Sequence, residues 1–140
     1  MIDIDTSTPF GQRVRDRLEN EIVVWLVTVD AAGTPQPSLV WFYWHEETML
    51  IYSQPEKPKL RNIEHNSRVS VHFDSDGHGG NVVVLTGSAV IDSSIPPANE
   101  VPAYIAKYHD HILGIGMTGE SFAQEYSVPI HFTPEKLRGH

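Results

Sequence analysis

The stretch from Ile22 to His45 decides the fold, and it reads IVVWLVTVDAAGTPQPSLVWFYWH. Its first part, Ile22 to Val29, is apolar and rich in β-branched residues, which predicts a buried strand. Asp30 to Thr34 supplies turn residues with a glycine among them, and Gln36 to His45 predicts a second strand. Two such strands joined by a short turn predict a β-hairpin.

Further strands and short helices are predicted on both sides of this hairpin. The additional strands are Thr48 to Ser53, Arg68 to Asp74, Asn81 to Ile91 and Val128 to Thr133. The predicted helices are Phe10 to Glu21, Lys57 to Asn66, Asn99 to Leu113 and Ser121 to Tyr126. Six strands with short turns and flanking helices predict an α+β fold built on a six-stranded antiparallel β-barrel. We expect one domain over residues 1–140, with residues 1–9 as a loose leader.

Composition excludes several classes of protein. The chain has 140 residues, a formal net charge of -8 and no cysteine. Disulfides, thiolate metal sites and a cysteine nucleophile are therefore excluded. The acidic balance disfavours nucleic-acid binding, which needs many cations on one surface. No apolar run approaches the roughly 18 residues of a membrane span, and no signal peptide is recognisable. These features predict a soluble, cytoplasmic protein that binds a small molecule, with neither a nucleic-acid nor a membrane partner.

The ten residues from Ser53 to Asn62, which read SQPEKPKLRN, carry a local excess of positive charge. Lys57, Lys59 and Arg61 fall within five positions, although the whole chain has only 10 Lys and Arg. The segment lies between a predicted strand and a predicted helix, where cations, free N–H groups and the helix dipole act together on an anion. It therefore predicts binding of a phosphate or polycarboxylate, and the alternative is a helix face with solvated charges.

Four consecutive aromatic residues, Trp41 to Trp44, end the second strand of the hairpin. Alternation along a strand sends two of them to each face. One pair can fill the barrel, and the other needs a partner subunit, a bound ring, solvent, or a helix of the same chain. A glycine-rich loop, Asp76 to Gly80, could also approach a cofactor closely, although such loops are common in hairpins.

The familiar catalytic motifs are absent from the sequence. The eight histidines include His109 and His111, which face apart on a predicted helix, and no His-Glu-x-x-His spacing occurs. We therefore expect no metal site. The chain also has no Gly-x-Ser-x-Gly, no Gly-x-Gly-x-x-Gly and no Walker phosphate loop.

Several segments in a fixed order resemble the pyridoxamine-phosphate-oxidase-like, flavin-binding split barrels. These segments are Gln36–Phe42, Leu50–Ser53, Lys57–Ile63, Arg68–Val71, Gly79–Val84 and Val101–Tyr104. The resemblance covers about residues 15 to 138 and is strongest to the actinobacterial branch that uses the deazaflavin coenzyme F-420. The chain lacks the long C-terminal extension of the true pyridoxamine-phosphate oxidases, so oxidation of vitamin B6 is not expected.

The resemblance implies a homodimer with the cofactor at the subunit interface, and it assigns cofactor contacts to nine residues. Ser38, Val40 and Trp41 would lie against the ring system. The anionic tail would be held by Ser53, Lys57, Lys59, Arg61 and Asn62. Gly80 would contact the cofactor from the glycine-rich loop.

The function that follows is reduction of a small organic substrate by hydride transfer from reduced coenzyme F-420. No side chain need act as a nucleophile, and the candidate proton donors are Tyr104, Lys107 and Tyr108. FMN is the alternative cofactor, although three cations suit the longer, more anionic tail of F-420 better. A carrier that binds cofactor without turnover, and a purely structural dimer, also stay open.

Overall fold

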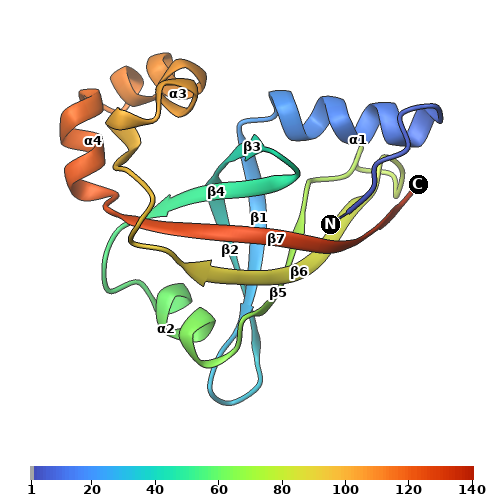
Figure 1. Ribbon diagram of the computed structural model, residues 1–140. Coiled ribbons are helices and arrows are strands. Elements are labelled where there is room, and N and C mark those ends of the chain that lie inside the picture. Colours follow the sequence, from blue (N-terminus) through green and yellow to red (C-terminus); the bar gives the residue numbers. More distant parts are fainter. Residues whose placement is uncertain (1) are drawn as a thin grey trace.

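One antiparallel sheet of seven strands, in the order β2-β1-β5-β6-β7-β4-β3, curls into a partial barrel at the centre of the computed structural model (Figure 1). The structure describes residues 2–140. The strands are β1 (Val23–Val29), β2 (Pro35–Trp41), β3 (Tyr43–His45), β4 (Thr48–Ser53), β5 (Arg68–His72), β6 (Val83–Ile91) and β7 (Val128–Gly139). The helices are α1 (Pro9–Asn20), α2 (Pro58–His65), α3 (Pro102–Gly114) and α4 (Gly119–Glu125), with a short 3-10 turn η1 (Ala98–Glu100) before α3. The predicted α+β class and antiparallel sheet are confirmed, and the sheet forms a partial barrel.

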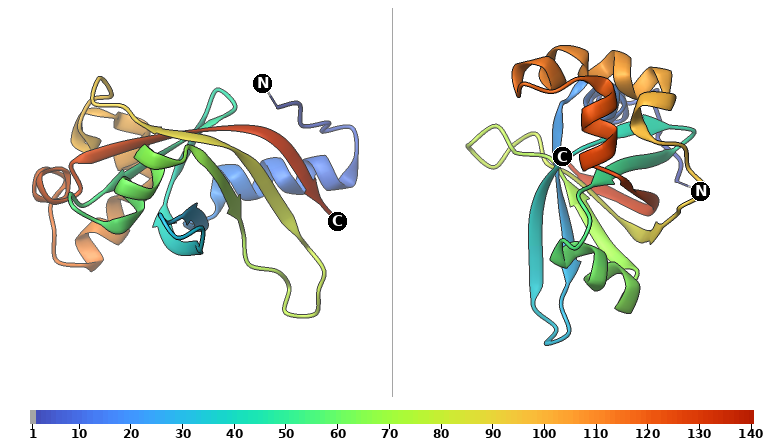
Figure 2. Two further views of the ribbon diagram at one scale, coloured as in Figure 1. Left: turned by 90° about the horizontal axis from the view of Figure 1, so that it is seen from below. Right: turned by 90° about the vertical axis from the view of Figure 1, so that its left-hand side faces the viewer.

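The predicted hairpin is present as β1 and β2, which pair from Val23↔Trp41 to Val29↔Pro35. Its turn is held by the Asp30 carboxylate, which accepts the backbone N–H groups of Ala32 and Thr34 at 3.0 and 2.9 Å. These local hydrogen bonds fix the turn and with it the register of the two strands. The end of the hairpin extends beyond the rest of the sheet (Figure 2).

The expected number of six strands is wrong, because the strand predicted from Gln36 to His45 is two strands. The sheet breaks at Phe42, whose backbone N–H donates to the hydroxyl of Tyr108 at 2.7 Å instead of to a neighbouring strand. Before the break β2 pairs with β1, and after it β3 pairs with β4, with Tyr43 opposite Leu50. A single chain segment therefore joins β2 and β3, the two strands at the opposite edges of the sheet.

The last strand is also longer than expected. β7 continues past Thr133, where the predicted strand ended, to Gly139, and it pairs with β6 along this extension. The register shifts between Thr86 and Gly87, and a side chain at Gly87 would place its Cβ 2.1 Å from the carbonyl oxygen of Thr133. Glycine allows this close approach of the two strands.

The barrel interior is a single apolar cluster to which the strands and α1 contribute. Val14 and Leu18 of α1 are fully buried in it, and Thr8 caps the helix by accepting the N–H of Gly11 at 3.0 Å. Residues 2–8 form neither helix nor strand, yet the side chains of Ile2 and Ile4 also lie in this cluster. Within the segment expected to be a loose leader, Ile2 and Ile4 therefore pack onto the barrel, while residues 3 and 5–8 are exposed. Met1 lies outside the described residues.

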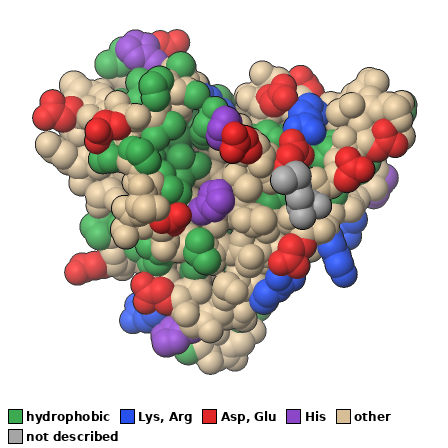
Figure 3. Space-filling view, in the orientation of Figure 1, with side chains coloured by type: hydrophobic (Ala, Val, Ile, Leu, Met, Phe, Trp, Pro, Cys, Tyr) green, Lys and Arg blue, Asp and Glu red, His purple; other side chains and the backbone are tan. Residues whose placement is uncertain are grey.

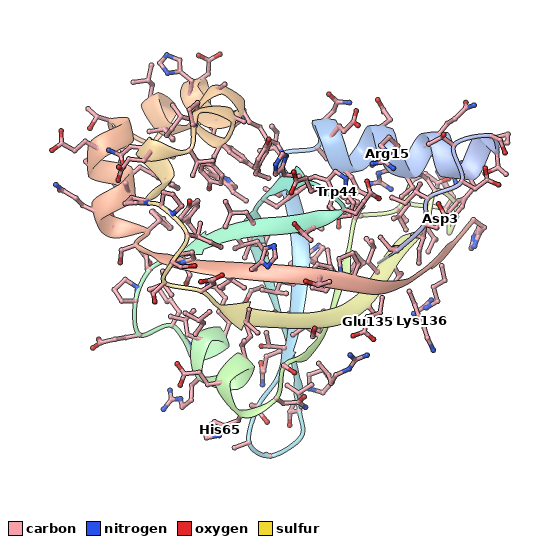
Figure 4. The ribbon with its side chains drawn as sticks, viewed as in Figure 1. Asp3, Arg15, Trp44, His65, Glu135 and Lys136 are labelled. Atoms are coloured by element: carbon pink, nitrogen blue, oxygen red, sulfur yellow. The ribbon has the colours of Figure 1, made fainter. Side chains whose placement is uncertain are left out.

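An ion pair fastens α1 to the edge of the sheet. Arg15 contacts the carboxylate of Glu47 in the β3–β4 turn at 2.6 Å. Figure 4 labels Arg15 on α1 and Trp44 on β3, and the side chain of Trp44 is buried in the barrel cluster. The same α1 carries Arg17, which donates to the carbonyl oxygens of Asp74 and Asn81 and so holds the long β5–β6 loop.

A second apolar cluster lies at the other end of the molecule, where α3 and α4 pack together (Figure 1). Its fully or nearly fully buried members include Tyr104, Tyr108 and Ile112 of α3 and Phe122 of α4. Hydrophobic side chains also gather on the surface over these two helices (Figure 3). Across residues 2–140, no helix combines the length and apolarity needed to cross a membrane.

Candidate functional site

The basic segment forms the junction between β4 and α2. Ser53 ends the strand, Glu56 turns the chain with a φ of 65°, and Pro58 begins the helix. Lys57 occupies the N-cap position, and its side chain makes no capping hydrogen bond. The positive end of α2 is therefore presented together with the ammonium groups of Lys57 and Lys59, which is an arrangement suited to an anion.

Two adjoining pockets open on this junction, and Lys57 and Lys59 line both of them. We name the first the aromatic pocket; it has a volume of about 250 Å³. Its lining residues are Leu39, Val40, Trp41, Tyr52, Ser53, Gln54, Lys57, Lys59, Tyr104, Ile115, Phe122 and Tyr126. We name the second the polar pocket; it has a volume of about 430 Å³. Its lining residues are Thr28, Asp30, Gln36, Pro37, Ser38, Lys57, Pro58, Lys59 and Asn62.

The charged form of Lys59, which lines both pockets, is destabilised by its surroundings. Burial, and then the charge of Lys57, lower the pKa of Lys59 below its ordinary value of 10.5. An anion placed between the two ammonium groups would relieve both effects, because it neutralises the repulsion and replaces lost hydration. The junction is therefore a place where an anion is bound more favourably than on an open surface.

Seven of the nine predicted cofactor residues come together around this junction. Val40, Trp41 and Ser53 line the aromatic pocket, and Ser38 and Asn62 line the polar pocket. Lys57 and Lys59 line both pockets. Arg61 is exposed and lines neither pocket. Gly80 lies in the protruding β5–β6 loop and also lines neither, and its N–H donates to the Asp76 carboxylate at 3.0 Å (Figure 2).

Asn62 has a structural partner within the polar pocket. Its side-chain amide donates to the hydroxyl of Thr28 at 3.0 Å, and both residues are buried. This bond ties α2 to β1 and so fixes the position of the basic junction relative to the hairpin. A buried polar pair of this kind is costly to break, since either partner would be left unsatisfied.

The aromatic run divides as alternation predicts. Phe42 and Trp44 are buried in the barrel cluster, whereas Trp41 packs under the helices of the same chain. The Trp41 ring stacks on Tyr108 and Phe122, with centroids 4.6 and 5.4 Å apart, and Trp41 also lines the aromatic pocket. Of the environments considered for the second pair, packing beneath a helix of the same chain is confirmed for Trp41.

Sequence reasoning missed the wall that α4 contributes. Phe122 and Tyr126 stack on each other with centroids 4.5 Å apart and line the aromatic pocket. Gln54 of the basic segment donates to Glu125 of α4 at 2.6 Å, which links the wall to the junction. The spacing of Phe122 and Tyr126, four residues apart, indicated a helix face, but nothing in the sequence placed that face beside β4.

The three candidate proton donors on α3 differ in their surroundings. The Tyr108 hydroxyl and the Lys107 ammonium are both bonded to the backbone at Phe42, at 2.7 Å in each case. Burial lowers the pKa of Lys107 to about 8. Neither group lines the aromatic pocket, whereas Tyr104 does.

Within residues 2–140, no group of three His, Asp or Glu side chains is placed to hold a metal ion.

Comparisons with known proteins agree with this architecture. The family model for pyridoxamine 5′-phosphate oxidase matches residues 10–140. Among solved structures, an F-420 reductase is similar, with a TM-score of 0.67 and 20% identity over 89% of this chain and 94% of that one. A putative pyridoxamine 5′-phosphate oxidase from Listeria innocua has a TM-score of 0.69 and 21% identity, over 91% and 94% of the two chains.

A third similar structure carries a different description. HutZ, a heme storage protein from Vibrio cholerae, has a TM-score of 0.64 and 17% identity, over 99% of this chain and 95% of that one. A search of curated protein sequences found no match. Likeness at these identities establishes a shared fold, so the ligand must be argued from the pockets themselves.

Proposed function

Because the chain belongs to the pyridoxamine 5′-phosphate oxidase family, we propose that the junction shared by its two adjoining pockets binds a flavin-type cofactor and that the protein is an oxidoreductase. The observation that carries the proposal is the position of Lys57 and Lys59, which line both pockets at the start of α2. Ammonium groups at a helix N-terminus suit the phosphate that every flavin-type cofactor carries.

The residues around the junction fit such a group on two sides. The lysines and Ser53 offer donors to its anionic tail, while Val40 and the Trp41 ring offer an apolar surface to a flat ring system. Ser38 and Asn62 line the polar side. When bound, the cofactor supplies hydride chemistry, and the protein binds it, orients it and keeps water from the reacting face.

We propose coenzyme F-420 as the cofactor, with FMN as the alternative. The two cations shared by the pockets, Lys57 and Lys59, favour a tail with more than one negative group, as F-420 carries. FMN would place one terminal phosphate at the same lysines. The F-420 reductase and the heme storage protein among the similar structures make F-420 and heme necessary comparisons in any binding experiment.

A homodimer with the cofactor at its interface is part of this proposal. Leu39 on β2 and Val90 on β6 expose about half of their side-chain surface, at 52% and 51%. We take these two residues as candidate interface residues, because the core of a dimer interface buries apolar side chains. In such a dimer Gly80, which is remote from the pockets of its own chain, could approach the partner's cofactor through its protruding loop.

The experiment that tests the proposal is a titration of the purified protein with F-420, FMN and hemin in parallel, followed by turnover assays. The proposal expects micromolar or tighter binding of F-420 and oxidation of its reduced form by a small organic acceptor. Tight FMN binding with weak F-420 binding would favour the alternative cofactor. Binding without oxidation across a panel of acceptors would identify a carrier instead of an enzyme.

A further inference from the structure

The hydroxyl of Tyr104 is buried without a hydrogen-bond partner. The side chain is 0% exposed, and no group within residues 2–140 accepts from or donates to its oxygen. Tyr52, whose ring packs edge-on against that of Tyr104, instead donates to the carbonyl oxygen of Pro96 at 2.6 Å. Buried polar groups in folded proteins are nearly always paired, so an unpaired hydroxyl points to a partner supplied from elsewhere.

The aromatic pocket determines what that partner can be. Tyr104 lines the pocket together with the rings of Trp41, Phe122 and Tyr126. Trp41 and Phe122 are nearly parallel, at 15°, as are Phe122 and Tyr126. These rings stack on one another in a row, and a planar ligand can pack edge-to-face against such a row. The volume of about 250 Å³ is below the roughly 300–1,000 Å³ of drug-sized ligand sites, so the planar part is one or two rings.

The charges of the pocket narrow the ligand further. Lys57 and Lys59 are the charged side chains among its lining residues, so a cation is disfavoured. Burial raises the pKa of Tyr104, which keeps its hydroxyl protonated and able to donate. The group that suits such a donor in a largely apolar pocket is a neutral acceptor, and a carbonyl oxygen has the required lone pairs.

We propose that the aromatic pocket is a subsite for a planar, one- or two-ring ligand with a carbonyl oxygen, and that the Tyr104 hydroxyl donates a hydrogen bond to this oxygen. The inference rests on the proposed function in one respect, since it takes this ligand to be a second substrate at the Tyr104 and Tyr126 side of the pocket, beside a cofactor held at the lysines. The subsite itself requires only the protein.

The test uses 1-indanone as the planar ketone and indane, its hydrocarbon counterpart, as the matched probe. Both are titrated by calorimetry into wild type, Tyr104→Phe and the control Tyr52→Phe, without cofactor. One neutral hydrogen bond corresponds to an affinity change of about two- to tenfold. We expect Tyr104→Phe to lose about this factor for indanone and nothing for indane. Tyr52→Phe should keep its indanone affinity, because its hydroxyl already donates to Pro96.

Infrared spectroscopy of the bound ketone provides a readout that a merely structural role would not change. In wild type the carbonyl stretch of bound indanone should lie at lower wavenumber than in Tyr104→Phe. Equal stretches in the two proteins, equal affinity of wild type for indane and indanone, or no binding of indanone would each overturn the proposal.

A parallel titration with F-420 separates this inference from the proposed function. Failure of wild type to bind F-420, with the indanone results as expected, would contradict the cofactor proposal and leave the subsite standing. A loss of F-420 affinity in Tyr104→Phe without any loss for indanone would assign the hydroxyl to the cofactor and overturn the subsite.

Discussion

Tyr104 and Tyr108 lie one turn apart on α3 and are both fully buried, yet only the Tyr108 hydroxyl has partners. The Tyr108 oxygen accepts the N–H of Phe42 at 2.7 Å and lies 2.6 and 2.8 Å from the carbonyl oxygens of Ile22 and Phe42. It thus secures the break between β2 and β3. Tyr108 therefore stabilises the fold, whereas Tyr104 lines the aromatic pocket.

Tyr108→Phe should lower the free energy of unfolding by about 1–3 kcal/mol, because the buried N–H of Phe42 loses its acceptor. Urea denaturation followed by circular dichroism measures the change. Tyr104→Phe is the matched control on the same helix; it removes a hydroxyl with no partner in residues 2–140 and should not destabilise the protein. Equal destabilisation by the two substitutions would contradict the distinction between them.

Lys107 should make stability rise with pH above about 8. Burial lowers its pKa in the folded state to about 8, against 10.5 for an ordinary lysine. Between these values the unfolded chain binds more protons than the folded one, so the free energy of unfolding increases as pH rises. Unfolding curves at pH 7.5, 8.5 and 9.5 measure this slope, and Lys107→Met should reduce it. An unchanged slope in the variant would assign the pH dependence to other groups.

Asn62 and Thr28 should be energetically coupled. Thr28→Val and Asn62→Leu each leave one buried polar group unpaired and should each cost about 1–3 kcal/mol. The double variant removes both groups and should be more stable than the sum of the single effects predicts. Additive effects in this double-mutant cycle would show that the bond does not hold α2 to β1.

The fold was largely predictable from local sequence, and the wrong strand count has a cause that is distant in the sequence. The hairpin, the Thr8 cap and the strand–helix junction at Ser53 to Asn62 depend on neighbouring residues, and each is present. The break at Phe42 was not predictable, because four consecutive aromatics favour one strand. It depends on Tyr108, which lies 66 residues away along the chain.

The site was predictable on its basic side and not on its aromatic side. β2 is part of the hairpin and the basic segment follows it closely in sequence, whereas the wall from α4 reaches the pocket only through tertiary packing. The prediction that Arg61 contacts the cofactor conflicts with helix geometry. Residues two apart on a helix point in different directions, so Lys59 and Arg61 cannot both face the pockets. The structure exposes Arg61, and other cations such as Lys136 lie toward the far end of β7 (Figure 4).

Binding of an anionic cofactor should weaken as pH rises toward 10.5. Lys59 titrates below the ordinary lysine value because of burial and the charge of Lys57, and a bound anion favours its charged form. Affinity is therefore full while Lys59 is protonated and falls as pH passes through its lowered pKa. Titrations with F-420 from pH 7 to pH 10 measure the decline, which should be shallower in Lys59→Met. A steep decline retained in that variant would point to another group.

The most direct test of the two-lysine site compares Lys59→Met with Arg61→Met in titrations with F-420 and FMN. The two substitutions remove the same charge from the same helix, but only Lys59 lines the pockets. A hydrogen bond to a charged group contributes about 1.5–3 kcal/mol, so Lys59→Met should weaken binding of the true cofactor by about 10- to 150-fold. Arg61→Met should stay within about twofold of wild type, since exposed charges contribute little. Equal losses in the two variants, or no loss in Lys59→Met, would contradict the account.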